Sequence, residues 1–198
     1  MTVRATSTAA WIHPSAIIDA GASIGDGARI WHHCHVMGGA RIGQNVMLGQ
    51  GCFVGSDVTI GDGSRIQNHV SVFEGVELEA DVFVGPSATF TNVLRPRAFL
   101  KQEFSRTVVR RGATIGANAT VLPGLEIGAF AFVGAATLVR ENVAPHALVV
   151  GVPGRQIGWV GTRGERLGFD GEVGVCPVSG ERYRLTPDGL IPESSALP

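Results

Sequence analysis

Glu74 and Asn92 are two polar residues whose spacing in this chain suggests chemistry. They lie eighteen residues apart, and each follows an apolar residue, Val72 or Phe90, by two positions. If eighteen residues make one turn of a coil, the carboxylate and the amide point outward from one corner of successive turns. Such a pair can hold a hydroxyl or an amine through hydrogen bonds. We therefore predict a site there, rather than a solvated carboxylate and a turn-forming asparagine.

An apolar residue at every sixth position indicates that the chain forms such a coil. The repeat runs without a gap from Ile12 to Phe90, shifts by one position, and resumes from Val109 to Val139. A period of six fits neither a helix nor one long strand, but it fits a short strand followed by a bend. Three such units close a three-sided coil of about eighteen residues, and successive coils stack at the strand spacing of ~4.8 Å.

The predicted fold class is therefore all-β, a parallel β-helix of hexapeptide repeats over residues 11–158. An N-terminal arm at residues 1–10 precedes it, and a capping tail at residues 159–198, read as a two- or three-stranded ribbon, follows it. The apolar residue of each hexad and the residue two positions before it should point inward. Cys34 and Cys52 share that second inward position, so we expect two stacked, buried thiols. Polar bend residues such as Asp26, Asp62 and Asn118 are expected to adopt left-handed backbone angles.

The repeat is interrupted at residues 92–107, which we predict to leave the coil as a loop beside Glu74 and Asn92. A break in an otherwise regular solenoid is a common place for function. Between residues 95 and 111 a single acid, Glu103, faces six basic residues, a local balance of +5. These are Arg95, Arg97, Lys101, Arg106, Arg110 and Arg111. Arginine forks suit the phosphates of a nucleotide, although a solvated loop has the same composition.

A second candidate region lies near the end of the repeats. Ala117 and Ala135 are eighteen residues apart, each after an Ile-Gly or Val-Gly step. Small residues stacked in this way leave a narrow groove with exposed backbone amides, in which a pantetheine arm can lie. Arg155, in the following GVPGR segment, could meet the phosphates of such a ligand. The alternative is that alanine lines a prism face where subunits meet.

Composition limits which other classes of function the protein can have. The chain has 198 residues and a net charge of −1, which gives no general reason to expect nucleic acid or an anionic membrane as partner. The sequence shows no signal peptide, and its longest apolar run, near residues 129–139, is short and interrupted by glycine. We therefore expect a soluble cytoplasmic protein of one main domain.

Two longer strings carry a family resemblance. RIQNHVSVFEGVELEADVFVGPSATFTNVLRPRA and GATIGANATVLPGLEIGAFAFVGA resemble the left-handed β-helix (hexapeptide-repeat) nucleotide-sugar N-acetyltransferases of bacterial surface-polysaccharide (lipopolysaccharide) synthesis. The match covers about residues 11–160. Members acting on UDP-2-acetamido-3-amino-2,3-dideoxy-glucuronate are the most similar, and enzymes acting on dTDP-3-amino-3,6-dideoxyhexoses share much of the pattern.

The resemblance implies a left-handed coil, acetyl-CoA as co-substrate and a homotrimer with active sites between subunits. It implies that Glu74 and Asn92 contact the sugar near its amine. The candidate substrate-binding residues in and beside these strings are Gln67, Asn68, His69, Phe90, Arg95 and Arg97. The candidate cofactor-binding residues are Ala117, Asn118, Ala135, Arg110 and Arg155.

The expected reaction is direct acetyl transfer in a ternary complex without an acyl-enzyme, in which the departing thiolate can accept the amine proton. His33 or His69 as general base is the alternative. A dTDP-linked acceptor and a non-catalytic β-helix scaffold also stay open. A γ-type carbonic anhydrase uses a similar prism with zinc-binding histidines that include an HxxxxH pair. This chain has no such pair, so we expect no metal.

Overall fold

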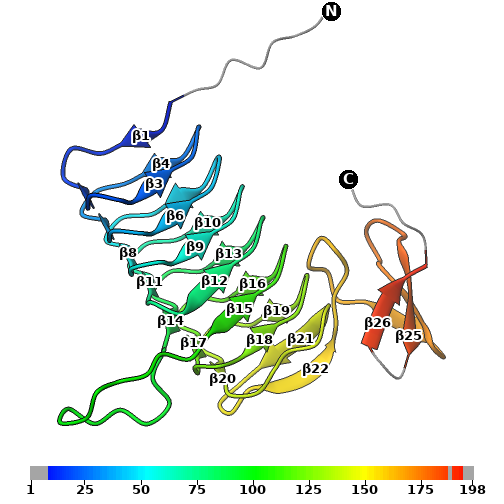
Figure 1. The fold of residues 1–198 in the computed structure, drawn as a ribbon. Helices are drawn as coiled ribbons and strands as arrows, with labels where there is room; N and C mark the ends of the chain where they lie inside the picture. Colours follow the sequence, from blue (N-terminus) through cyan, green and yellow to red (C-terminus); the bar gives the residue numbers. More distant parts are fainter. Residues whose placement is uncertain (1–8, 187–188, 194–198) are drawn as a thin grey trace, which may run out of the picture.

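The computed structural model describes residues 9–186 and 189–193, so residues 1–8 of the predicted arm lie outside the described residues. These residues contain strands, turns and bends but no helix. Ile12 pairs with Ile30, and Ile30 with Leu48, in parallel register eighteen residues apart. The coils stack into a three-sided prism (Figure 1). The predicted all-β fold class and the parallel β-helix of hexapeptide repeats are confirmed.

Each side of the prism is one sheet, and we call the three sides face A, face B and face C. Face A is formed by β1 (Trp11–Ile12), β4 (Arg29–Ile30), β7 (Met47–Leu48), β10 (Arg65–Ile66), β13 (Phe83–Val84), β16 (Thr114–Ile115), β19 (Phe132–Val133), β21 (Ala147–Val150) and β22 (Arg155–Trp159). Face B is formed by β2 (Ile17–Ile18), β5 (His35–Val36), β8 (Phe53–Val54), β11 (Ser71–Val72), β14 (Thr89–Phe90), β17 (Thr120–Val121) and β20 (Leu138–Val139). Face C is formed by β3 (Ser23–Ile24), β6 (Arg41–Ile42), β9 (Thr59–Ile60), β12 (Val76–Leu78), β15 (Thr107–Val109) and β18 (Glu126–Ile127).

Short bends join the faces at three corners, named AB, BC and CA after the faces they connect in chain order. In one coil, residues 67–69 form corner AB, residues 73–75 form corner BC and residues 79–81 form corner CA. Asn118 has a φ of 56° at its corner, as predicted. At the bends of Asp26 and Asp62 the prediction is wrong by one position, because Gly27 and Gly63 take the left-handed angle.

Side chains at the bends bind the neighbouring coil. Asp62 Oδ1 accepts a hydrogen bond from the Gln44 amide at 2.7 Å, and Asn68 Oδ1 accepts one from the Gln50 amide at 3.0 Å. This stacking explains the glycine that often follows the hexad residue. A Cβ on Gly49 would lie 2.5 Å from Asn68 Oδ1, so any larger residue would displace the bend of the next coil.

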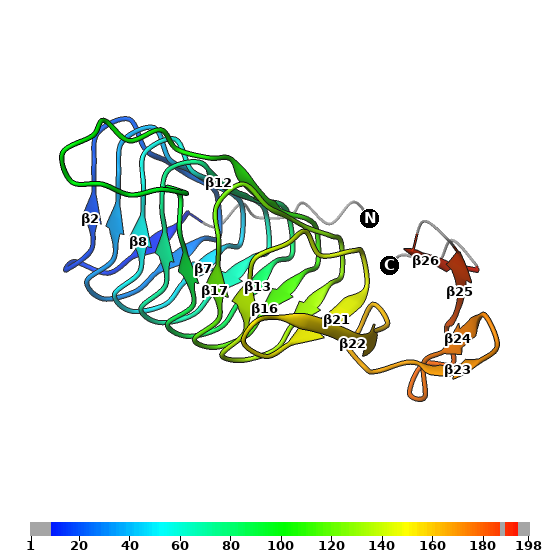
Figure 2. The same cartoon turned by 90° about the horizontal axis from the view of Figure 1, so that it is seen from below.

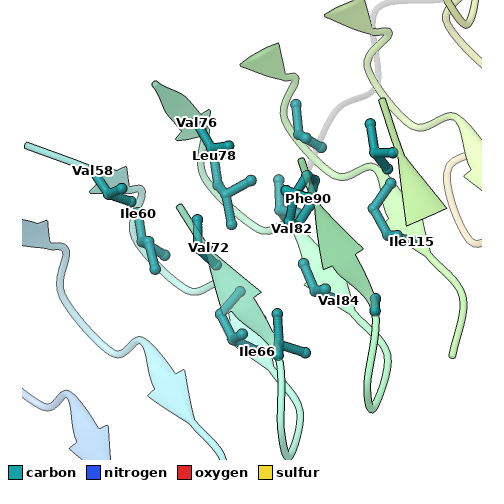
Figure 3. Packing of buried hydrophobic residues seen from close by; sticks show 14 of the residues in the cluster. Val58, Ile60, Ile66, Val72, Val76, Leu78, Val82, Val84, Phe90 and Ile115 are labelled. Atoms are coloured by element: carbon teal, nitrogen blue, oxygen red, sulfur yellow. The ribbon is translucent and has the colours of Figure 1, made fainter. Parts of the chain in front are cut away.

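The inward positions form one continuous core along the prism (Figure 3). Ile30, Leu48, Ile66 and Val84 are fully buried, whereas Ile12 in the first coil is 39% exposed. Cys34 and Cys52 are free and buried at 1% exposure each, and their thiols donate to the carbonyls of Gly49 and Gln67.

Two buried hydroxyls in this core differ in their hydrogen bonding. Ser64 Oγ donates to the Glu79 carbonyl at 3.0 Å and accepts from the Val82 amide at 3.1 Å. Thr137 Oγ1 is buried without a partner among the described residues. A satisfied buried hydroxyl stabilises the fold, whereas an unpartnered one has lost its hydration without replacement.

We expect Ser64→Ala to lower the free energy of unfolding by about 1–3 kcal/mol, because it leaves the buried Val82 amide and the part-buried Glu79 carbonyl without this partner. Thr137→Val should leave it unchanged or raise it by up to about 1 kcal/mol. Urea unfolding of both variants measures the contrast. A Thr137→Val variant that is destabilised as much as Ser64→Ala would contradict the assignment.

The chain beyond the last coil forms a fourth sheet, which is antiparallel and has four strands rather than the two or three predicted. Its four strands are β23 (Gly168–Asp170), β24 (Val173–Val175), β25 (Arg182–Thr186) and β26 (Gly189–Pro192). Figure 2 shows this sheet beyond the C-terminal end of the prism. Tyr183, Leu167, Cys176 and Leu190 make its small core. That this sheet caps the prism stays a prediction.

His146 connects the prism to this sheet. Its ring stacks on Phe130 and meets Tyr183 edge-on, both at 5.2 Å between ring centroids, and its Nδ1 is 3.0 Å from the Val160 carbonyl. Burial lowers the pKa of His146 below its ordinary value, although the Val160 carbonyl and the charge of Glu181 act in the opposite direction. The folded protein therefore favours the neutral ring.

A histidine with a depressed folded-state pKa contributes stability that is present above its ordinary pKa of about 6.5 and is lost as the pH falls below it. We expect the free energy of unfolding to fall between pH 7.5 and pH 5.5. The slope should be smaller in His146→Asn, because asparagine tolerates the φ of 62° and does not titrate. Equal slopes in the two proteins, measured by urea unfolding, would contradict this role of His146.

Candidate active site

The coil is interrupted between β14 and β15, and the intervening residues 91–106 project from corner BC (Figure 1). Leu78 pairs with Val109, which is 31 residues later instead of eighteen, so thirteen residues are added to this turn. The two ends of the loop stay together, because the Ser105 amide donates to the Asn92 carbonyl at 2.9 Å. The loop is thus an insertion into a coil that continues on both sides.

Glu74 and Asn92 lie one above the other where the loop leaves the prism. Asn92 Nδ2 donates to the backbone carbonyl of Glu74 at 3.0 Å, so its amide holds the bend that carries the carboxylate. Both residues are half-buried. The geometry thus makes Glu74 the group that can face a ligand, with Asn92 positioning it.

A cleft of about 340 Å³ opens beside Glu74 under the returning end of the loop. This volume is within the usual range for small-molecule sites. The lining residues are Asp57, Thr59, Glu74, Gly75, Val76, Glu77, Phe104 and Arg106. Arg106 Nη2 is 2.5 Å from Glu77 Oε2, which closes one side of the cleft with an ion pair.

Four of these residues besides Glu74 and its neighbours were not anticipated: Asp57, Thr59, Glu77 and Phe104. Arg106 was predicted only as one member of the basic segment and not as a lining residue of this cleft. For the first three a signal exists, because Asp57 and Thr59 stand eighteen residues before Gly75 and Glu77. Phe104 and Arg106 reach the cleft only through the path of the loop, which the repeat does not specify.

The basic residues between positions 95 and 111 fall into two groups, those paired with an acid and those without an acidic partner. Arg110 binds Glu79 at 2.8 Å and Glu126 at 2.9 Å on corner CA, and Arg111 binds Asp81 at 3.2 Å. The hydrogen bonds from Arg110 hold the pKa values of Glu79 and Glu126 below their usual range. With Arg106 also paired, the basic residues left without an acidic partner among the described residues are Arg95, Arg97 and Lys101.

Two predicted binding residues need correction. Phe90 is fully buried in the prism core, because it occupies the inward hexad position, so it cannot touch a substrate. Arg110 lies at corner CA, whereas the other candidate cofactor residues lie at corner AB, and its guanidinium is already held by two carboxylates.

Apart from Arg95 and Arg97 of the loop, the remaining binding candidates lie at or beside corner AB. Gln67, Asn68 and His69 form this corner in the coil of Glu74, and His69 has a left-handed φ of 60°. Ala117, Asn118 and Ala135 continue the same corner toward the C-terminus. Arg155 follows it as the first residue of β22. The amides of Ala117 and Ala135 have no acceptor within the described part of the chain, in contrast to Gln44 and Gln50 at other bends.

Comparisons with known proteins agree with this architecture. Residues 39–74 match the family model described as bacterial transferase hexapeptide (six repeats). A dTDP-3-amino-3,6-dideoxy-alpha-D-galactopyranose 3-N-acetyltransferase from Aneurinibacillus thermoaerophilus is 37% identical over 190 residues, which cover 96% of this chain and 97% of that protein.

The chain belongs to the hexapeptide-repeat nucleotide-sugar N-acetyltransferases. A more distant relative, the serine acetyltransferase of Salmonella typhimurium, is 37% identical over 62 residues, 31% of this chain and 23% of that protein. Among solved structures, WeeI from Acinetobacter baumannii shares the fold, with a TM-score of 0.51 and 18% identity over 74% of this N-acetyltransferase and 57% of that chain. The predicted left-handed β-helix and acyltransferase class are therefore confirmed.

Among residues 9–186 and 189–193, no three histidine, cysteine, aspartate or glutamate side chains gather as a possible metal site. The same residues include no helix that is long and apolar enough to span a bilayer.

Proposed function

We propose that the enzyme transfers the acetyl group of acetyl-CoA to the 3-amino group of a dTDP-linked 3-amino-3,6-dideoxyhexose. The observation that carries this proposal is the 37% identity, over nearly the whole of both chains, to an enzyme named for that reaction. The Glu74 cleft at the loop has the size for a sugar ring and carries groups that can bind an amine. Cytoplasmic location and a role in surface-polysaccharide synthesis belong to the same proposal.

The charge of the cleft favours this acceptor over the UDP-2-acetamido-3-amino-2,3-dideoxy-glucuronate that the sequence strings suggest. Three carboxylates, on Asp57, Glu74 and Glu77, face one guanidinium, on Arg106. A sugar ammonium is attracted to this excess of negative charge, whereas a uronate carboxylate is repelled by it. The apolar side chains of Val76 and Phe104 suit the 6-methyl group of a deoxyhexose.

Acetyl-CoA is proposed to lie along the column of Ala117 and Ala135 at corner AB. The unpaired amides of Ala117 and Ala135 suit the carbonyls of the pantetheine arm, and Arg155 suits its phosphates. Arg95, Arg97 and Lys101 of the loop suit the diphosphate of the sugar nucleotide. The enzyme is proposed to be a homotrimer with its sites between subunits.

In the proposed reaction, the bound ammonium first loses one proton to solvent, and Glu74 then accepts a hydrogen bond from the free amine and aligns its lone pair with the thioester carbonyl. The new N–C bond forms as the C–S bond breaks, and the amine proton passes to the departing thiolate. Alignment of two reactants can supply about 7–11 kcal/mol in model systems, so no acyl-enzyme and no strong protein base are required. Asn92 acts indirectly in this reaction, by holding the bend that carries Glu74.

The proposal is tested by measuring thiol release from acetyl-CoA with matched acceptors. We expect turnover with a dTDP-3-amino-3,6-dideoxyhexose and a kcat/KM at least about tenfold lower with the UDP-linked 3-amino-glucuronate. The reverse preference would show that the acceptor is wrong. If no amino-sugar nucleotide releases thiol and CoA does not raise the melting temperature, the scaffold alternative holds instead.

A further inference from the structure

A hollow lined by two tryptophans and an arginine lies at the N-terminal end of the prism. β1 and β4 form this end of face A (Figure 1). Trp11 of β1 pairs in register with Arg29 of β4, and Trp31 follows β4 at the start of corner AB. These three side chains line a hollow of about 320 Å³. This volume is within the usual range for small-molecule sites, and the reaction proposed above does not use it.

The two indoles leave much of their aromatic surface exposed at this hollow. Trp11 is 46% exposed and Trp31 is 39% exposed. Their ring centroids are 5.1 Å apart at an interplanar angle of 63°, which is an edge-to-face arrangement. In such a pair the ring that contributes its edge keeps both of its faces free, so π surface is available to a further flat ring.

Neighbouring residues hold these rings in place. The backbone amides of Trp11 and Trp31 donate to carbonyls seventeen residues later in the chain, at 2.8 and 3.0 Å. The ring of His32 is stacked with that of His13 at 3.5 Å and with that of Trp31 at 6.2 Å between centroids. A ligand therefore meets rings that are already ordered, which reduces the entropy that binding costs.

The side chains that line the hollow are donors of hydrogen bonds. An indole has one N–H donor, and a guanidinium has five N–H donors and a positive charge, whereas neither group is an acceptor. Arg29 forms no ion pair within residues 9–186 and 189–193. No carboxylate of the described chain lines the hollow.

This chemistry selects among small ligands. A neutral sugar has hydroxyl groups that donate as well as accept, and the lining would leave their donors unmatched. A nucleotide fits better, because its phosphate oxygens are charged acceptors for a guanidinium and its base can stack on an indole.

We propose that the hollow binds a nucleoside diphosphate, with the base stacked on the indoles of Trp11 and Trp31 and the phosphates on the guanidinium of Arg29. Every base has a π-face, so pyrimidine and purine nucleotides should bind alike. The hollow adjoins corner AB and the Glu74 cleft adjoins corner BC, so the width of face B and the prism core separate them. One nucleotide therefore does not fill both sites of one chain.

Intrinsic fluorescence locates the binding, because Trp11 and Trp31 are two of the three tryptophans and Trp159 ends β22 at the other end of the prism. We expect dTDP and ADP to quench the emission with Kd values below about 1 mM and within about threefold of each other. The double variant Trp11→Phe, Trp31→Phe should lose this response. An unresponsive wild type, or quenching that persists in the double variant, would overturn the proposal.

Two ligands of the proposed reaction carry the recognised group, since CoA contains an adenosine diphosphate and the acceptor a dTDP. Separate titrations with CoA and with a dTDP-linked sugar distinguish these sources. A response to at least one of them is expected, and a response to neither would overturn the proposal. Thymidine, which lacks the phosphates, should bind at least about tenfold more weakly than dTDP.

A matched pair of substitutions tests the guanidinium. Arg65 lies in the same outward row of face A as Arg29, two coils later, and both side chains are exposed. We expect Arg29→Gln to weaken quenching by dTDP about tenfold or more, and Arg65→Gln to leave the Kd within about twofold of the wild type. An equal change in the two variants would overturn the site. Acetyl transfer is not measured in these titrations, so their failure leaves the proposed function standing.

Discussion

Replacing Glu74 with glutamine is expected to lower kcat/KM for the amino-sugar nucleotide by about 10²–10³-fold, with little change in stability. The carboxylate lines the cleft, and its loss removes both the charge that attracts the amine and the acceptor that aligns its lone pair. Thiol release under subsaturating acceptor measures the effect. The half-exposed side chain makes no core contact, so the melting temperature should remain within about 2 °C of the wild type.

Glu141→Gln is the matched control for this experiment. Glu141 follows the hexad residue Val139 by two positions, as Glu74 follows Val72, so it occupies the same corner in a later coil. It lies 3.7 Å from Arg140 and does not line the cleft. Wild-type activity in Glu141→Gln is therefore expected. If both variants lose activity equally, or if neither does, Glu74 has no special role.

Removing the loop is expected to abolish activity while preserving the fold. A single glycine in place of residues 93–106 restores the six-residue step from Phe90 to Val109, in the manner of Gly75 one coil earlier. Gly75 has a φ of 91° at that bend, so glycine suits the position. The free energy of unfolding should change by no more than about 1 kcal/mol, because the inserted loop contributes little to the core. The kcat/KM should fall by at least about 10³-fold, since Phe104, Arg106 and the unpaired basic residues are lost together.

Circular dichroism and thiol release separate the two outcomes of the deletion. A variant that retains the β-sheet spectrum and loses activity supports the assignment of the site to the loop. A folded variant with wild-type kcat/KM would place the reaction elsewhere on the prism. Arg140→Ala, at the same corner and outside the cleft, controls for loss of positive charge and should keep its activity.

The asparagine beside Glu74 illustrates how sequence and structure contribute differently. The eighteen-residue spacing predicted that Glu74 and Asn92 lie one above the other, because the coil length follows from the inward hexad. It did not predict that the Asn92 amide binds the Glu74 backbone, since the direction of a side chain at a bend depends on the local coordinates. We expect Asn92→Ala to lose both about 1 kcal/mol of stability and part of the activity. Urea unfolding and kcat/KM measure the two losses, and a loss of activity at unchanged stability would favour direct contact with the substrate.

The sequence by itself determined the prism, its eighteen-residue columns and the position of the inserted loop. Inward positions must be apolar and bends must be tight, so the pattern leaves one arrangement for the repeats. The same rule places Phe90 in the core, against its assignment to the site. Only the tertiary structure decided which arginines stay unpaired. Arg106 binds an acid 29 residues earlier in the chain, and Arg110 binds one 31 residues earlier. The inserted loop lies between these partners, and the repeat does not specify its path. The tertiary structure also decided that the residues predicted to bind the sugar and those predicted to bind acetyl-CoA are divided between the two edges of face B, because that relation depends on which corner of a closed coil each residue occupies.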